Sequence, residues 1–354
     1  MMKWLKYALF LAIGLGLAWY ASKDADFDTI WSATLQLNWF WAILSMVTSY
    51  VAMIIRGYRW NILLAPLGYQ SRNSNNVHSV AFGYMMNDLI PRSGELARCA
   101  LLSRAEQIPV DKLVGTVILE RIVDMLTLLL VIGLATWLQA DAIQALWDQI
   151  TAAKATQGPT EKSYTLYYVL IALIVLAFVG WWILGKLQHI PFFGKIKNFA
   201  DGIFSGMKSV AGLKQKNKFI LLTLGIWTAW LLMAYFMMKA LPATAGLDLA
   251  DALFFMVAGS FGMIVPTQGG LGAYHLTSKY GFIALGLDGA LGLTFAWISW
   301  VGKTIVEFVV GSIGFIIVDQ RSKNKQATVG RGWRAILELN SEKRQIGRAS
   351  CRER

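Results

Sequence analysis

The sequence has few charged residues for its length. Only 15% of its 354 residues are charged, whereas an average soluble domain has roughly 25%. Hydrophobic residues make up 56% of the chain, and they include 15 tryptophans, 18 phenylalanines and 12 tyrosines. This balance excludes an ordinary soluble domain and is typical of a protein that crosses a membrane several times.

Cysteine and the common catalytic motifs are also scarce. The two cysteines, Cys99 and Cys351, form no CxxC pair and show no spacing typical of a disulfide framework or a metal site. The sequence contains no P-loop, Rossmann fingerprint, HExxH or G-x-S-x-G motif, so nothing supports an ATP-driven pump or a membrane hydrolase. We therefore expect no catalytic residue, no bound metal and no cofactor.

Long apolar runs recur along the chain. A helix needs about 20 residues to cross roughly 30 Å of hydrocarbon. The first run follows Lys3 and Lys6 but lacks a small-residue cleavage site, so we interpret it as an anchor rather than a signal peptide. The pattern predicts an all-α polytopic membrane protein with about six transmembrane helices, at Trp4–Tyr20, Leu37–Ile55, Val114–Leu138, Tyr164–Leu184, Phe219–Ala240 and Leu291–Val318.

Two further apolar segments are interrupted by proline. Val77–Ile90 and Ala252–Val265 each have 14 residues, about 21 Å of helix, which is too short to cross the membrane. Pro91 and Pro266 end them and open a shared pattern, P-x-x-G-x-L, at an offset of 175 residues. Because proline removes an amide donor and glycine permits a sharp turn, each segment is predicted to be a re-entrant helical hairpin. The offset indicates an internal duplication.

The distribution of positive charge predicts the orientation of these segments. Lysine and arginine residues in loops and tails number 24 on one side of the predicted topology and four on the other. The positive-inside rule makes the rich side cytoplasmic, with both termini on it, and we expect the inner membrane. The first hairpin then enters from the cytoplasm and the second from outside. Opposed hairpins predict an inverted repeat, with halves at about 37–185 and 219–318 and a substrate site near the midplane.

The end of the chain is basic. We divide the sequence into a membrane domain at 1–320 and a cytoplasmic tail at 321–354, in which helical periodicity is not evident beyond residues 333–339. The last residues, 345–354, look like a cloning junction and add to the net charge of +12. This excess of positive charge therefore does not indicate nucleic-acid binding.

Several ionisable residues lie inside the apolar segments. Such residues are costly in a membrane and normally face a partner or a watery path. Glu120 and Asp124 share one face of a predicted span with Arg121 beside them, and a second span contains Lys303 and Glu307 as an i, i+4 pair. An alternative is that these pairs only lock one helix to another.

The break in the first hairpin adds two more charges. If its second arm starts at Ser93 or Gly94, Glu95 lies in the first turn, where a carboxylate complements the helix dipole. Arg98 is three residues further along, and we expect it to pair with Glu95.

Four stretches of the sequence resemble one family. MNDLIPRSGELAR, LERIVDML, IIRGYRWNILL and PTQGGLGAYH, in their order and spacing, are similar to the transmembrane region of lysylphosphatidylglycerol synthase, also called the flippase-like domain family, over residues 1–320. The resemblance implies a membrane domain that moves a lipid or a lipid-linked headgroup between leaflets. Bifunctional relatives carry an aminoacyltransferase domain after this region. About 36 mostly polar residues follow Val318 here, so we expect a translocator rather than an enzyme of lysyl-lipid synthesis.

Roles follow from residue chemistry. Guanidinium groups match phosphate oxygens, so we expect the arginines to gather a lipid phosphate, while the carboxylates balance them or contact a cationic headgroup. Amide and backbone donors would act from the outer side, and a histidine there titrates near neutral pH. The candidate substrate-binding residues are Arg56, Arg59, Asn87, Asp88, Arg92, Glu95, Arg98, Glu120, Arg121, Asp124, Gln268, Gly269, Gly270, His275, Lys303 and Glu307.

Other interpretations remain open. RGYRW is also a plain positive-inside anchor, and His275 is also explained as a packing histidine. DADFD, with Asp24, Asp26 and Asp28, has the D-x-D pattern of glycosyltransferases that use lipid-phosphate sugar donors, although this pattern is very common and a solvated acidic loop between two spans is the better explanation. A third alternative is a lipid-binding scaffold with its basic stretch at Lys186–Lys218.

The expected partners follow from these hypotheses. We expect a membrane phospholipid or another lipid-linked substrate, and no nucleic acid. A homodimer and a separate lipid-modifying enzyme are further partner hypotheses.

Overall fold

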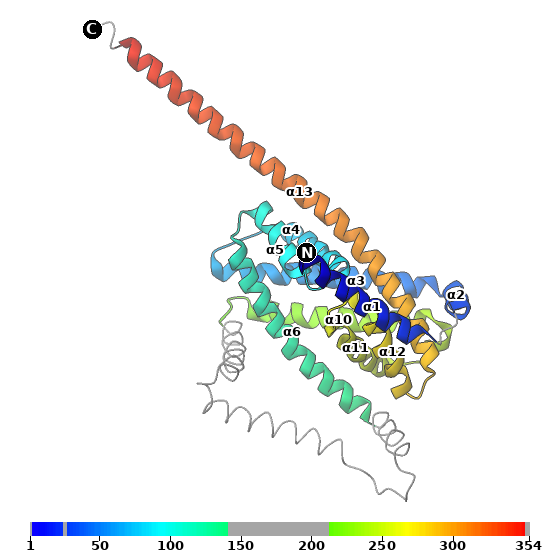
Figure 1. Cartoon of the computed structure of the whole chain (residues 1–354). Helices are drawn as coiled ribbons and strands as arrows, with labels where there is room; N and C mark the ends of the chain where they lie inside the picture. Colours follow the sequence, from blue (N-terminus) through cyan, green and yellow to red (C-terminus); the bar gives the residue numbers. More distant parts are fainter. Residues whose placement is uncertain (1, 24–26, 141–211, 351–354) are drawn as a thin grey trace, which may run out of the picture.

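The computed structural model describes residues 2–23, 27–140 and 212–350, and the regular structure in these ranges is helical (Figure 1). The all-α fold class is therefore confirmed. The α-helices are α1 (Met2–Ser22), α2 (Phe27–Leu35), α3 (Trp39–Leu64), α4 (Asn73–Leu89), α5 (Gly94–Glu106), α6 (Val110–Leu138), α10 (Lys216–Ala240), α11 (Leu249–Ile264), α12 (Ala273–Ala284) and α13 (Gly289–Ser350). Short 3₁₀ turns are η1 (Ala65–Leu67), η2 (Pro242–Thr244) and η3 (Gln268–Gly270).

The long helices coincide with the predicted spans. Three described segments are long and apolar enough to cross a membrane, namely Trp39–Leu67, Lys216–Ala240 and Gly289–Lys325. α1 and α6 correspond to the first and third predicted spans. The predicted span Tyr164–Leu184 lies outside the described residues, so the total of six spans stays a prediction.

α13 continues well past the end of its predicted span. The helix has 62 residues and reaches Ser350, so it includes most of the tail in which the sequence showed little periodicity. The last proline of the chain is Pro266. Because no later proline removes a backbone donor, nothing in the sequence forces this helix to stop near the membrane surface.

The helices repeat along the chain as the duplicated pattern predicts. α3, α4, α5 and α6 begin at residues 39, 73, 94 and 110, and α10, α11, α12 and α13 begin 176 to 179 residues later. Packing follows the same correspondence, because α4 contacts α13 and α11 contacts α6. α3 packs antiparallel against its own counterpart α10: Ser45 donates to the Met233 carbonyl at 2.8 Å and Arg59 to Thr223 at 3.1 Å. These exchanged contacts are those of two halves related by a two-fold axis.

The two hairpins break where the sequence predicts. The first break lies between α4 and α5 and contains Pro91, and the second lies between α11 and α12 and contains Pro266. The residue before each proline, Ile90 or Val265, has an extended backbone, because the proline ring disfavours a helical residue in front of it.

The hairpins open toward opposite ends of α13. Arg321 donates to Ser74 and Asn75, both at 2.7 Å, at the open end of the first hairpin. The second hairpin opens at the start of α13, which begins at Gly289 shortly after α12 ends. The 33 residues from Gly289 to Arg321 amount to about 50 Å of helix. The two hairpins therefore point toward each other from the two ends of one membrane-crossing helix.

The arms of the first hairpin touch through their backbones at Gly94. A Cβ at this position would overlap the carbonyl oxygen of Gly83 and the side-chain amide of Asn87, and the Gly94 N–H donates to Asn87 Oδ1 at 2.7 Å. Glycine is needed here for close approach.

Replacing Gly94 is expected to open this hairpin. Gly94→Ala should cost about 1–3 kcal/mol of stability through overpacking and lower the thermal unfolding temperature of the purified protein by several degrees. The control is Gly115→Ala on α6, where a Cβ meets no atom within 4 Å; there alanine should be neutral or stabilise by up to about 1 kcal/mol. Equal unfolding temperatures for the two variants would contradict the close contact.

The orientation of the hairpins can be tested with single cysteines. Exposed positions Gln70, before α4, and Ala243, before α11, suit this purpose in a background with Cys99→Ala and Cys351→Ala. A membrane-impermeant thiol reagent should label Gln70→Cys from the cytoplasmic side and Ala243→Cys from outside. Labelling of both positions from one side would show that the hairpins do not enter from opposite faces.

Candidate functional site

A buried ion-pair cluster joins α3, α5 and α6. Arg56 and Arg59 come from α3, Arg98 from α5, and Glu120 and Asp124 from α6; we call these five residues the arginine cluster. One oxygen of Glu120 lies 3.1 Å from Arg56 Nε and 3.2 Å from Arg59 Nη2, and the other lies 3.0 Å from Arg98 Nη2. Glu120 thus binds three guanidinium groups from two helices.

Asp124 completes the cluster one helical turn further along α6. It pairs with Arg56 and with Arg59, the latter at 2.7 Å. Residues four apart share a helix face, so the prediction that Glu120 and Asp124 lie side by side is confirmed. None of these side chains is more than 10% exposed, and the charges are therefore screened little by solvent.

Aromatic rings cover the guanidinium groups. Arg98 lies 4.6 Å from the ring centre of Trp60, and Arg56 lies 5.3 Å from that of Trp230, which stabilises a cation through the ring quadrupole. Sequence reasoning missed both rings. Both contacts join different helices, Trp60 of α3 to Arg98 of α5 and Trp230 of α10 to Arg56 of α3, so no local spacing in the sequence indicated them.

The cluster carries an excess of positive charge. Three arginines face two carboxylates, and Nε of Arg59 has no hydrogen-bond partner. A buried charge without a counter-charge is costly. One further negative group bound beside the cluster would therefore neutralise its excess charge.

The predicted pairing of Glu95 with Arg98 is wrong. Glu95 instead lies 2.5 Å from Arg121 of α6, and both side chains are partly exposed. Arg98 instead forms an ion pair with Glu120, which is fully buried beside it. The buried carboxylate needs the counter-charge more than the partly exposed one does, because desolvation penalises an unpaired ion most in the interior.

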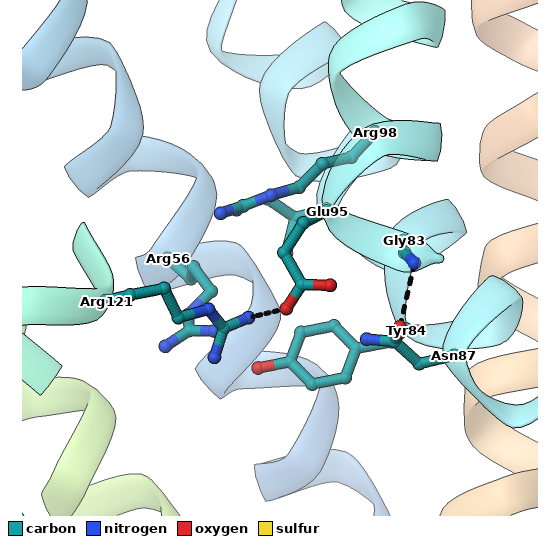
Figure 2. Close-up of a pocket in the computed structure, with 9 residues that line it drawn as sticks. Arg56, Gly83, Tyr84, Asn87, Glu95, Arg98 and Arg121 are labelled. Carbon is teal, nitrogen blue, oxygen red and sulfur yellow. Dashed lines mark hydrogen bonds and ion pairs between the residues drawn. The ribbon is translucent and has the colours of Figure 1, made fainter. Parts of the chain in front are cut away.

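A recess opens next to the cluster at the tip of the first hairpin. Figure 2 shows Arg56, Arg98 and Arg121 approaching it from three helices, with Glu95 and the ring of Tyr84 between them. The enclosed part of the recess is small, about 20 Å³, which is room for about one water molecule, so a larger polar group needs the recess to widen. Its lining is Arg56, Val80, Gly83, Tyr84, Asn87, Gly94, Glu95, Arg98 and Arg121.

A second ionic group lies where α4 meets α13. Lys303 Nζ is 3.2 Å from Asp88 Oδ1 and 3.1 Å from Glu307 Oε2; we call these three residues the lysine triad. The predicted Lys303–Glu307 pair is confirmed. No local pattern indicated that Asp88, 215 residues earlier in the chain, would join this pair, because that contact depends on which helices pack together.

The tips of the two hairpins contact each other beside the lysine triad. Arg92 Nη2 donates to the carbonyl of Ile264 at the end of α11, at 2.6 Å. A Cβ on Gly269 would overlap the carboxylate of Asp88, and Trp300 donates to the Gly269 carbonyl at 2.8 Å. The structure therefore places Arg92 at the hairpin contact and not in the arginine cluster, where the sequence analysis had grouped it.

The remaining candidates lie in the second hairpin. Gly269 and Gly270 both have positive φ, 55° and 79°, a region that favours glycine. His275 is fully buried, accepts from the Gly272 N–H at 3.3 Å and lies 4.1 Å from the ring centre of Trp297. This arrangement favours the packing role for His275.

Two other predicted sites, Gln268 and the DADFD stretch, are not part of the arginine cluster or the lysine triad. Gln268 faces Gly14 of α1, and its side-chain oxygen has no hydrogen-bond partner. In the DADFD stretch, Asp24 and Asp26 lie outside the described residues, and Asp28 lies in the first turn of α2.

The chain matches a known family over most of its length. The model for the family described as Lysylphosphatidylglycerol synthase TM region matches residues 7–311. A relative in Methanocaldococcus jannaschii, UPF0104 membrane protein MJ1595, is 29% identical over 100 residues, which is 27% of this chain and 30% of that protein. This alignment therefore spans less than a third of the relative's length. No solved structure matches the chain.

Removing the shared carboxylate is expected to destabilise the protein strongly. Glu120→Gln leaves three buried guanidinium groups with one carboxylate, a loss of about 3–5 kcal/mol for a broken buried pair. Glu95→Gln breaks the partly exposed pair with Arg121 and should cost at most about 1 kcal/mol. Thermal unfolding in detergent measures both, and a Glu120→Gln variant as stable as Glu95→Gln would refute the importance of the cluster.

Proposed function

The chain belongs to the Lysylphosphatidylglycerol synthase TM region family, and on that basis we propose that it moves a phospholipid, or another lipid-linked phosphate, between the leaflets of its membrane. The observation that carries this proposal is the arginine cluster, with its excess positive charge beside an open recess. The multi-pass membrane character of the chain follows from the family and from the apolar helices.

The chemistry of the recess suits a phosphate diester. Three of its lining residues are arginines and one is a glutamate. Guanidinium groups bind phosphate oxygens through paired N–H donors, and these bonds strengthen when water is excluded. A phosphodiester brings one negative charge, which would balance the excess in the arginine cluster. A zwitterionic lipid offers the same phosphate group together with a cation that Glu95 is placed to meet.

The opposed hairpins supply a route between leaflets. Their breaks free backbone groups from helical hydrogen bonds, and such groups in a membrane must be buried in protein or line a watery cavity. The recess lies at the tip of one hairpin, next to the point where Arg92 contacts the other. In transporters with broken helices, movement of one half against the other exposes such a site to each side in turn. We propose the same movement here, without a covalent step.

Lipid movement in vesicles tests the proposal. Purified protein in liposomes should speed the transfer of acyl-labelled phosphatidylglycerol between leaflets, measured by chemical quenching of the label in the outer leaflet. Arg98→Gln should slow this transfer by about tenfold or more, since a hydrogen bond to a charged group is worth about 1.5–3 kcal/mol.

The matched control is Arg104→Gln, because Arg104 is exposed and lies on the same helix outside the recess. It should leave the transfer rate unchanged. Thermal unfolding of both variants separates loss of transport from loss of fold. The proposal fails if no lipid class moves faster than in empty liposomes, or if the protein instead transfers a sugar in a manner that depends on Asp24 or Asp26.

A further inference from the structure

The lysine triad has an excess of negative charge, whereas the arginine cluster has an excess of positive charge. One lysine faces two carboxylates, and the side chains of Asp88 and Glu307 are each only 3% exposed while that of Lys303 is 18% exposed. With all three ionised, the triad carries one net negative charge away from bulk water. Such a charge is stable only when a cation or a proton neutralises it.

The geometry between the two carboxyl groups points to a proton. Asp88 Oδ1 and Glu307 Oε2 both lie within 3.2 Å of Lys303 Nζ, so the two carboxyl groups are close together, and protonation of one of them removes their mutual repulsion. The second oxygen of Asp88, Oδ2, is buried and receives no hydrogen bond. A metal ion would lie beside the ammonium group of Lys303 and be repelled by it, whereas a proton sits on a carboxylate oxygen.

We infer that the lysine triad is a proton-binding site, with one exchangeable proton shared by Asp88 and Glu307, and that this proton is taken up together with the lipid phosphate. The coupling to lipid rests on the proposed function. The proton site rests on the triad alone.

Neighbouring residues at the end of α4 connect the two sites. Asn87 lines the recess and accepts from the Gly94 N–H at 2.7 Å, while Asp88, the next residue, pairs with Lys303 at 3.2 Å. The recess and the triad are therefore built on one rigid turn of helix. A shift of this turn changes both at once.

The net charges of the two sites indicate how many protons are taken up with each lipid phosphate. The arginine cluster has one positive charge in excess, which one phosphodiester neutralises, and the triad has one negative charge in excess, which one proton neutralises. In a medium of low dielectric constant, the two opposite excess charges stabilise each other, so neutralising one of them favours neutralising the other. One proton per lipid phosphate, moving in the same direction, is the expected ratio.

The other ionisable groups around the triad do not supply the missing positive charge. Lys303 is the cation that acts on both carboxylates. Tyr274 of α12 interacts with Lys303 and is uncharged at neutral pH. The nearby groups for which the structure gives partners are engaged elsewhere: Arg92 bonds to a backbone carbonyl, Arg56, Arg59 and Arg98 bond within the arginine cluster, Glu95 pairs with Arg121, and His275 lies against Trp300.

Infrared difference spectroscopy of the purified protein tests the proton site without any lipid transport. On a change of pH, the carbonyl stretch of a protonated carboxyl group should appear and disappear in the wild type. Asp88→Asn and Glu307→Gln should each remove this band. Asp319→Asn should keep it, because Asp319 forms an exposed i, i+4 pair with Lys323 on the same helix. A band absent from the wild type, or present in both triad variants, would overturn the inference.

Gradients across liposomes test the coupling. With the membrane potential held at zero, an acidic outside should drive net movement of labelled phosphatidylglycerol from the outer to the inner leaflet in the wild type, and Asp319→Asn should behave alike. Glu307→Gln should move lipid equally in both directions whatever the gradient. Transport driven by a sodium gradient instead would overturn the assignment to a proton.

The two proposals fail separately. If the infrared band titrates but no lipid moves, the proton site stands and the proposed function falls. If lipid moves with no titrating band and no response to pH, the proposed function stands and the proton site falls. Thermal unfolding of Asp88→Asn and Glu307→Gln identifies a variant that has lost its fold, and the wild-type measurements decide in that case.

Discussion

The membrane part of this protein depends on one carboxylate. Glu120 is fully buried and lies within 3.2 Å of nitrogen atoms from three arginines, two on α3 and one on α5. An isolated guanidinium group in a membrane interior is costly, and so is an isolated carboxylate. The shared contact therefore fixes α3, α5 and α6 relative to one another and holds the second arm of the first hairpin against the helices that flank it.

Neither of the two buried ionic groups is neutral. The arginine cluster has a positive excess and the lysine triad a negative one, and consecutive residues, Asn87 and Asp88, reach toward them from the end of α4. Between the hairpins the contact is narrow, and it is made by Arg92 on the Ile264 carbonyl and by the close approach of Gly269 to Asp88. Strong local charge and a small hairpin contact are compatible with a protein that rearranges at this point.

Local features of the fold could be predicted from the sequence. The prolines of the two breaks, the duplication offset and the spacing of Glu120 and Asp124 are all encoded within a few residues or in a simple repeat. Their consequences, two hairpins and one charged helix face, are found in the structure. The length of α13 was underestimated because polarity ends a membrane span but does not end a helix.

Contacts between distant segments could not be predicted in this way. Arg98 had a carboxylate three residues away in Glu95, yet it pairs with Glu120, because burial decides which ion most needs a partner. Similarly, Asp88 meets Lys303 only because α4 packs along α13.

The antiparallel pairing of α3 with its own counterpart α10 has a structural consequence. A single half could bury the same surface against a second copy inserted upside down, so the packing of α3 against α10 has the geometry of a dual-topology homodimer joined in one chain.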